Sequence, residues 1–403
     1  MRYLLGVSLI VLMGFISCQS QQPSQGEMLP AASRTEQYMP RLEGKRVAVV
    51  ANHTSLVGEV HLVDTLLAQG IDVRKIFSPE HGFRGEREAG ELIGNYQDAQ
   101  TGLQVVSLYG SNKKPEAEDL EDVDIVVFDI QDVGVRFYTY ISTMHYVMEA
   151  CAETQTTFLV LDRPNPNGFY VDGPVLDTQY RSFVGMHPIP LVHGMTIAEL
   201  GRMINDQGWL NHGVRCDYDW VACKNYTHDS LYRLPVAPSP NLPNMQSIYL
   251  YPSVGLMEGT VINVGRGTEW PFQVFGHPRL QHGEMTYIPR GIKGVSENPK
   301  YKGQACHGID LRKYPADSLI QHPAIRLEWI RQAIHQVPAE DFFMPFFNNL
   351  AGNQSLMHQL KQGRTPSEIK KGWQDDLEAF MKLRRQYLIY QDYEEARRQG
   401  AAD

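Results

Sequence analysis

The sequence predicts an α/β protein whose first half forms a doubly wound parallel sheet, and two observations support this. Continuous apolar runs alternate with segments of helical spacing, which is typical of parallel strands covered on both faces. After about residue 215 the pattern changes to shorter segments separated by Pro- and Gly-rich stretches such as PVAPSPNLP at 235–243. This change indicates a second structural unit, with a boundary between residues 195 and 235.

The elements of the first half follow from these runs in chain order. KRVAVVA at 45–51 predicts a buried strand, and further strands are expected at 72–78, 104–109, 124–129 and 156–162. Helices are expected at 61–68, 140–153 and 196–207, the last with Thr196 as N-cap and Glu199 three residues later. Two more helices are expected near the end, at 327–336 and 375–398. No G-x-G-x-x-G follows the first strand, so the sequence carries no dinucleotide fingerprint.

The N-terminus has the composition of an export signal. Met1 and Arg2 precede the apolar run 3–17, and Cys18 follows. The run is too short for a comfortable membrane span, and a cysteine at this point resembles a bacterial lipobox, in which the cysteine becomes the lipidated N-terminus. We therefore expect a signal peptide over 1–18, a tether over 19–40 and a lipid-anchored protein of the periplasm or cell envelope. A plain cleaved signal is the alternative.

Charge and cysteine content exclude some classes of function. The chain of 403 residues has a net charge of -9 and a pI near 5.9, which argues against nucleic acid as the main partner. No C-x-x-C and no zinc-type spacing occurs. Cys216 and Cys223 flank a plausible strand and could pair in an oxidising compartment, but unpaired buried thiols are the preferred interpretation.

Polar clusters follow four of the predicted strands. They are NHT (52–54), SPEHG (78–82), DIQDVGVRFY (129–138) and DRPNPN (162–167). In open α/β sheets ligands bind beyond the carboxyl ends of the strands, so these clusters are expected to share one site.

The clusters also form part of a longer series of motifs that resembles one family. The series is SPEHGFRG (78–85), TGL (101–103) with SLYG (107–110), FDIQDVGVRFYTY (128–140), LDRPNP (161–166), HGMT (193–196), PSPN (238–241), and EGT (258–260) with VGRGT (264–268). From about residue 41 to near the C-terminus, the chain is similar to exo-acting β-N-acetylmuramidases of bacterial cell-wall recycling, once catalogued as a domain of unknown function. It departs from them at Gln273 in WPFQ, where Glu is usual, and at HPR (277–279), which leaves the substrate detail open.

This resemblance implies a fold and a reaction. The fold is a Rossmann-like domain over residues 41–215 and a smaller C-terminal α/β domain over 216–403, with the active-site cleft between them. The reaction is release of N-acetylmuramic acid from the non-reducing end of peptidoglycan fragments, without a metal or organic cofactor.

Glycoside cleavage needs an acid that protonates the leaving oxygen and a second carboxylate that activates water or attacks the anomeric carbon. Glu80 is the expected acid, because Gly82 permits a tight loop and Phe83 is expected to shield the carboxyl from water. His81 would position Glu80 or bind substrate. The candidates for the second carboxylate are Glu258, Asp132 and Asp129, in that order. Helix capping is the alternative role for Glu80.

Substrate selection should involve a cation, because muramic acid carries a lactyl carboxylate. Arg84, Arg136, Arg163 and Arg266 are the candidates, each with a structural ion pair as the alternative. Tyr138 and Tyr140 suit the apolar faces of sugars, and Asn165 and Asn241 suit hydroxyl groups. Asp129, Gln131 and His193, which lie in the motifs of the resemblance, complete the expected binding residues.

Two rival hypotheses remain at this point. The first is a lipid-anchored protein that binds muropeptides without cleaving them. The second is a metal-dependent hydrolase built on His53, His81, His193 and Asp129, which the lack of an H-x-x-x-H or H-x-H pair disfavours.

Overall fold

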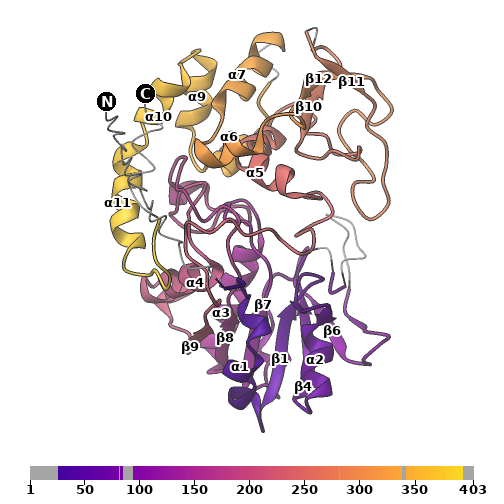
Figure 1. Ribbon diagram of the computed structural model, residues 1–403, viewed down its shortest axis with the longest axis vertical. Helices are drawn as coiled ribbons and strands as arrows, with labels where there is room; N and C mark the ends of the chain where they lie inside the picture. Colours follow the sequence, from indigo (N-terminus) through magenta and orange to yellow (C-terminus); the bar gives the residue numbers. More distant parts are fainter. Residues whose placement is uncertain (1–25, 81, 85–93, 281, 338–341, 394–403) are drawn as a thin grey trace, which may run out of the picture.

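The computed structural model describes residues 26–80, 82–84, 94–280, 282–337 and 342–393. Two domains are stacked along the long axis of the molecule (Figure 1). The lower domain in this view carries a seven-stranded sheet, and the upper domain is mainly helical with a three-stranded sheet. The predicted two-domain α/β architecture is confirmed.

The large sheet runs in the order β5-β6-β4-β1-β7-β8-β9. Its strands are β1 (Arg46–Ala51), β4 (Asp72–Ser78), β5 (Tyr96–Gln97), β6 (Gln104–Ser107), β7 (Ile125–Asp129), β8 (Thr157–Leu161) and β9 (Tyr218–Val221), and β2 (Leu56–Val57) with β3 (Val60–His61) forms a separate hairpin. All neighbours pair in parallel except β5 with β6. Counted along the chain, the parallel strands have the order 3-2-1-4-5-6 of a Rossmann-type doubly wound sheet.

Helices cover both faces of this sheet. They are α1 (Thr35–Leu42), α2 (Leu62–Ala68), α3 (Tyr140–Thr154) and α4 (Ile197–Asp206), with short 3-10 turns η1 (Ala31–Ser33), η2 (Ala117–Asp119), η3 (Thr178–Tyr180) and η4 (Asn211–Gly213). Val47, Val49 and Ala51 of β1 pack in the layer of α1 and α2, whereas Ala48 and Val50 pack in the layer of α3 and α4. Burial on both faces explains the continuous apolar run of this strand.

The capping of α4 agrees with its sequence. Thr196 accepts a hydrogen bond from the backbone N–H of Glu199, and the Glu199 carboxylate accepts one from the N–H of Thr196 at 2.9 Å. This reciprocal pair is the expected capping box.

The second domain follows β9. It contains α5 (Met245–Val254), η5 (Gly255–Gly259), β10 (Val274–His277), β11 (Met285–Tyr287), β12 (Cys306–Asp310), α6 (Ala316–Gln321), α7 (Leu327–Gln336), α8 (Phe347–Ala351), α9 (Ser355–Lys361), α10 (Pro366–Lys371) and α11 (Gln374–Arg384). The strands form an antiparallel sheet in the order β10-β12-β11. The main apolar core continues from Phe128 and Phe158 of the first domain to Phe272, Phe342 and Phe347 of the second, so the domains are packed together.

The structure differs from the expected organisation at three places. β9 pairs with β8, so the sheet of the first domain extends beyond the boundary expected at residue 215. Residues 29–40 are not part of a tether, because Leu29 pairs with Lys224 and Tyr38 is fully buried. The last helix ends at Arg384, and the residues from 385 to 393 instead run along the first domain, where tertiary hydrogen bonds hold Ile389 and Tyr390.

Cys151, Cys216, Cys223 and Cys306 are buried free thiols. Cys216 and Cys223 lie beyond opposite ends of β9, in keeping with the preference for unpaired thiols. Within the described ranges, no helix combines the length and the apolar character that crossing a membrane requires.

Candidate active site

The strand order reverses between β1 and β7, which is the point where doubly wound sheets bind ligands. The four polar clusters follow β1, β4, β7 and β8 and lie at the carboxyl edge of the sheet, as predicted. This edge faces the second domain (Figure 1). The junction between the domains is therefore the expected position of a ligand-binding site.

Glu80 lies two residues beyond β4 and is surrounded by hydroxyl groups. Thr139 donates a hydrogen bond of 3.3 Å to Glu80 Oε2. The phenol of Tyr109 is also hydrogen-bonded to Glu80, and burial together with this carboxylate raises the pKa of Tyr109. Burial and the charge of Glu80 likewise raise the pKa of Tyr140. Both tyrosines therefore stay protonated, and the phenol of Tyr109 can orient the carboxyl group of Glu80.

Glu258 enters the site from η5 of the second domain. Arg266 Nε donates a hydrogen bond of 2.6 Å to Glu258 Oε1, and the guanidinium lies 5.2 Å from the centre of the Phe272 ring. Gly265 and Gly267, on either side of Arg266, have φ values of +82° and +83°. These left-handed conformations suit glycine, and they give the loop the shape that brings Arg266 to Glu258.

Tyr251 of α5 shows that the two domains contribute to one site. Burial holds its pKa well above the usual value, and Glu258, Glu80 and Asp132 all raise it further, while Arg266 lowers it. Glu80 also acts on Arg266, whose pKa is raised by Glu258 against the effect of burial. Carboxylates from the first and second domains therefore both act electrostatically on the phenol of Tyr251, which stays protonated.

Asp132 is the candidate catalytic carboxylate whose pKa lies near neutral pH. Burial raises its pKa to about 7, although the backbone N–H of Gly134 donates to Oδ2 at 2.6 Å. His193 Nε2 lies 3.9 Å from the same oxygen, and burial lowers the pKa of His193 to about 3. The pair therefore consists of a neutral imidazole and a carboxyl group that titrates near pH 7.

Six expected site residues each have a buried polar atom without a hydrogen-bond partner in the described part of the chain. The atoms are Gln131 Oε1, Asp132 Oδ1, Arg136 Nε, Tyr140 Oη, His193 Nε2 and Asn241 Oδ1. Buried polar atoms are normally paired, so unpaired ones need an explanation such as a ligand or a water molecule.

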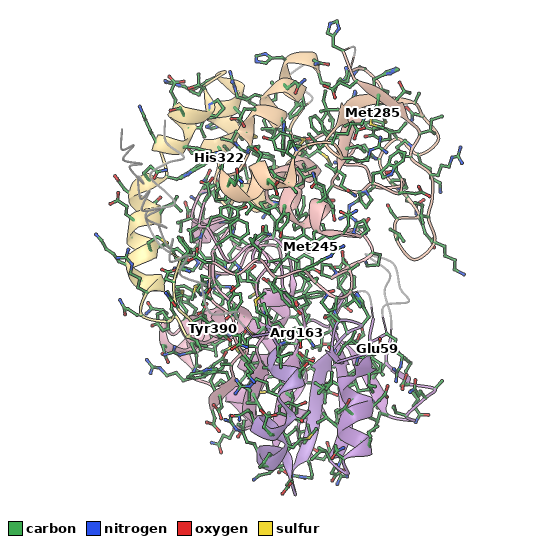
Figure 2. All side chains as sticks on the ribbon, viewed as in Figure 1. Glu59, Arg163, Met245, Met285, His322 and Tyr390 are labelled. Atoms are coloured by element: carbon green, nitrogen blue, oxygen red, sulfur yellow. The ribbon has the colours of Figure 1, made fainter. Side chains whose placement is uncertain are left out.

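Asp129 and Arg163 form a buried ion pair instead of a free binding surface. Arg163 donates to both Asp129 oxygens, at 2.6 and 2.9 Å, and also to the carbonyl of Leu56. Arg163 lies in the first domain, below the level of Met245 in Figure 2. Because both oxygens of Asp129 are engaged, it is the least suitable of the three candidates for the second carboxylate.

Arg136 is completely buried and connects the two domains. Its Nη1 donates to the carbonyls of Pro174 and Ile189, both at 2.7 Å, and its Nη2 donates to those of Leu350 and Ala351 at 3.0 and 2.8 Å. Burial without a carboxylate partner lowers the pKa of Arg136 to about 9. A ligand has no access to this guanidinium, so the expectation that Arg136 contacts substrate does not fit the structure.

Three further expected binding residues are engaged within the protein. Arg84 is paired with Asp64 and Asp98, with N–O distances of 3.0 to 3.3 Å. Asn165 Nδ2 donates to the carbonyl of Met195, and the hydroxyl of Tyr138 donates to the carbonyl of Pro238 at 2.8 Å. These contacts stabilise the loops around the site.

His81 lies outside the described residues. Of the other members of the metal hypothesis, His53 is hydrogen-bonded to the Ala237 carbonyl at 2.8 Å, and His193 and Asp129 have the partners given above. Among the residues that the structure describes, no group of three or more His, Cys, Asp or Glu side chains is arranged to hold a metal ion.

Three residues of the site, Tyr109, Thr139 and Tyr251, were not predicted from the sequence. Tyr109 and Thr139 lie inside motifs that were recognised, SLYG and FYTY, so their place beside Glu80 could have been suspected. Tyr251 belongs to no such motif, and tertiary structure alone reveals it.

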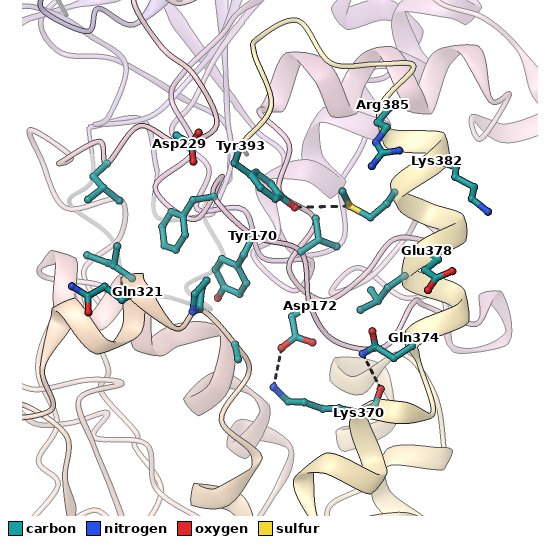
Figure 3. Close-up of a pocket in the computed structure, with 18 residues that line it drawn as sticks. Tyr170, Asp172, Asp229, Gln321, Lys370, Gln374, Glu378, Lys382, Arg385 and Tyr393 are labelled. Carbon is teal, nitrogen blue, oxygen red and sulfur yellow. Dashed lines mark hydrogen bonds and ion pairs between the residues drawn. The ribbon is translucent and has the colours of Figure 1, made fainter. Parts of the chain in front are cut away.

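A large cavity of about 930 Å³ lies elsewhere, between α11 and the loop around Tyr170 (Figure 3). Lys370 on its wall pairs with Asp172 at 3.1 Å, and Tyr393 contacts Met381. None of the expected catalytic residues lines it. The carboxylates at the domain junction, and not this cavity, therefore define the candidate site.

The fold is that of a two-domain α/β protein, with a Rossmann-type first domain and candidate acidic residues contributed by both domains. More specifically, the chain belongs to the exo-β-N-acetylmuramidase NamZ family, whose members are glycoside hydrolases. The N-terminal model of this family matches residues 47–246, and the C-terminal model matches residues 249–390.

Relatives of known sequence and structure agree with this assignment. The chain is 39% identical over 375 residues to the peptidoglycan β-N-acetylmuramidase NamZ of Bacillus subtilis (strain 168), which covers 88% of this chain and 89% of that protein. Two crystal structures of DUF1343 family proteins from Bacteroides fragilis NCTC 9343 are also similar. One is 46% identical with a TM-score of 0.85 and covers 91% of this chain and 99% of its own. The other is 28% identical with a TM-score of 0.77 and covers 90% and 99%.

Proposed function

We propose that this protein is an exo-acting β-N-acetylmuramidase, which releases N-acetylmuramic acid from the non-reducing end of peptidoglycan fragments in cell-wall turnover or recycling. The peptidoglycan β-N-acetylmuramidase of Bacillus subtilis supports the substrate class. The observation that carries the proposal is that Glu80 and Glu258, from different domains, both act electrostatically on Tyr251 and Arg266, while Arg266 donates a hydrogen bond to Glu258. Two carboxyl groups in one site are what glycoside cleavage requires.

The contacts suggest a role for each residue. Glu80, oriented by Thr139 and Tyr109, protonates the glycosidic oxygen. Glu258 is the first choice for the second carboxylate, and Asp132 is the alternative because its carboxyl group titrates near pH 7. Water supplies the hydroxyl group that ends on the released sugar, and the proton from Glu80 ends on the leaving hydroxyl.

Arg266 is the best remaining candidate for the lactyl carboxylate of muramic acid. Arg84, Arg136 and Arg163 each have all or most of their donors engaged by the protein. Within the described part of the chain, Arg266 donates a hydrogen bond only from its Nε. Its Nη1 and Nη2 therefore remain for a ligand. A guanidinium fork of this kind suits recognition of a carboxylate.

The test is turnover of a chromogenic β-glycoside of N-acetylmuramic acid by the purified protein, with the matching N-acetylglucosamine glycoside for comparison. We expect cleavage of the first, little cleavage of the second, and the same rates after treatment with a chelator. Saturable binding without turnover would favour the non-catalytic muropeptide binder, and loss of turnover after chelation would favour the metal-dependent hydrolase.

We also propose that the protein is exported and held at a membrane by lipid on Cys18. The basic, apolar and cysteine-terminated pattern of residues 1–18 supports this, although these residues lie outside the described part of the chain. Leu29 is already fixed to the first domain by its pairing with Lys224. The 11 residue-to-residue steps from Cys18 to Leu29 can span at most about 40 Å, so the lipid would keep the enzyme close to the bilayer.

A further inference from the structure

Lys300 has a largely buried ammonium group that donates to backbone carbonyls. Its Nζ donates to the backbone carbonyls of Glu258 at 2.9 Å, Thr260, and Ile262 at 3.5 Å. Within the described ranges, no carboxylate lies within ion-pair distance of Lys300. Buried lysines are normally paired with an acid. Here the cation instead binds three carbonyl groups of one short segment, the segment that carries Glu258.

The residues beside Lys300 hold the same segment and the loop that follows it. Tyr301 donates from its hydroxyl to the carbonyl of Val261 at 2.7 Å. The Asn263 amide donates to the carbonyls of Lys300 at 2.9 Å and Arg266 at 3.2 Å, and its oxygen accepts from the N–H of Gly265 at 2.7 Å. One small network therefore fixes the backbone beneath both Glu258 and Arg266.

We propose that Lys300 is a positioning residue, which holds the Glu258 segment so that this carboxylate and Arg266 face the substrate in the orientation that cleavage requires. This inference rests on the proposed function, because it concerns the same site and the same reaction. It adds a residue that touches no substrate and acts through the backbone of Glu258. Glycosidases depend on the separation of two carboxyl groups to within a few ångströms, so a shift of this segment should affect the chemical step more than substrate binding.

The proposal has a consequence for pH dependence. Burial lowers the pKa of Lys300 to about 8, Glu258 raises it and Arg266 lowers it, and these two are the charged groups that act on it. As pH rises through about 8, the ammonium becomes an amine, which has one donor fewer and no charge. The segment then loses part of its support. We therefore expect activity to fall on the alkaline side, with a midpoint set by Lys300.

The experiment compares three variants on the muramic acid glycoside across pH 5–10. Lys300→Met removes the charge and the donors at similar length, and Lys300→Arg keeps the charge to much higher pH. Lys302→Met is the matched control, because Lys302 is exposed and donates to the Glu297 carbonyl in its own loop. We expect Lys300→Met to lower kcat by roughly 10- to 100-fold with KM changed little, and to lack the alkaline decline near pH 8. Lys300→Arg should retain most activity with that decline moved upward, and Lys302→Met should match wild type.

The outcomes separate the possibilities. Wild-type kcat in a folded Lys300→Met protein would overturn the proposal, and so would equal effects on kcat and KM with the alkaline decline unchanged. If Lys300→Met does not fold, Lys300→Arg decides, because an unchanged decline near pH 8 in that variant would also overturn the proposal. Absence of turnover in the wild-type protein would instead contradict the proposed function itself.

Discussion

Arg266 donates from Nε to Oε1 of Glu258 across 2.6 Å, within a site that Glu80 approaches from the other domain. The side chains of Arg266 and Glu258 are 27% and 24% exposed, so a ligand can reach both. A cation hydrogen-bonded to Glu258 can serve in two ways. It can orient Glu258, and it can attract the negative group that distinguishes muramic acid from glucosamine.

Arg266→Leu should reduce selectivity for muramic acid. Losing a charge-assisted hydrogen bond to the lactyl carboxylate should cost roughly 1.5–3 kcal/mol in kcat/KM on the muramic acid glycoside. The glucosamine glycoside, already a poor substrate, should change little. Arg290→Leu, at an exposed position of the same domain, serves as control. Equal losses on both substrates would mean that Arg266 acts only through Glu258.

Arg136→Leu should instead reduce stability, because four buried carbonyl groups lose their donors. We expect the free energy of unfolding, measured with urea, to fall by at least about 3 kcal/mol. Arg41→Leu, which removes an exposed pair with Asp219, should cost less than about 1 kcal/mol. A stable Arg136→Leu protein with weakened binding of muramic acid would return this arginine to the list of ligand contacts.

Glu80→Gln should lower hydrolysis of a natural disaccharide by roughly 10²–10⁴ while leaving circular dichroism unchanged, because the amide keeps the shape of the side chain but cannot supply the proton. An aryl glycoside with a good leaving group needs less protonation and should lose less. Glu59→Gln, at an exposed position of the hairpin loop, should behave as wild type. Similar losses on both substrates would indicate that Glu80 only binds sugar.

Asp132 should give the enzyme a pH dependence near neutrality. Burial raises its pKa to about 7, so the carboxyl group is protonated below this pH and ionised above it. If the ionised form takes part in catalysis, kcat/KM should rise with pH through about 7, and Asp132→Asn should be slow and lack this rise. Asp206→Asn at the exposed end of α4 is the control.

The raised pKa of Asp132 also predicts a pH dependence of stability, which does not depend on catalysis. A folded-state pKa above the unfolded value means that the contribution is fully present below pH 4 and is lost as pH rises toward about 7. The melting temperature of wild type should therefore decline over this interval more than that of Asp132→Asn. Parallel curves for the two proteins would show that Asp132 is not shifted in this way.

Cys18→Ser should release the protein from the membrane fraction while leaving its activity on soluble glycosides intact. Fractionation and immunoblotting of cells that express each form provide the measurement. A Cys18→Ser protein that stays with the membranes would place the anchor elsewhere.

The sequence predicted those elements that depend on a local pattern of apolar residues. Runs such as 45–51 predict buried strands because both faces of the sheet are covered, and Glu80 could be expected at a site because it follows such a strand. The short strands β10, β11 and β12 have no such runs and were not predicted. The segment 29–40 was assigned to a tether because nothing local shows that Tyr38 becomes buried.

The roles of the arginines could not be predicted for a related reason. Arg136 donates to Leu350 and Ala351, more than 200 residues away, and Arg163 pairs with Asp129 through the folding of two separate loops. The sequence does not distinguish an arginine that binds a ligand from one that donates to backbone carbonyls. Only the positions of distant backbone atoms distinguish them.

The described chain both starts and finishes on the first domain. Leu29 pairs with Lys224 near one end, and near the other the hydroxyl of Tyr390 donates to Asp162 at 2.6 Å. The second domain is thus an insertion, and the chain before it and the chain after it are both held on the first domain. Tension applied through the N-terminal segment would therefore be carried by the first domain and would not load the smaller domain. A single protease cut within the smaller domain would likewise leave two fragments that remain attached to each other.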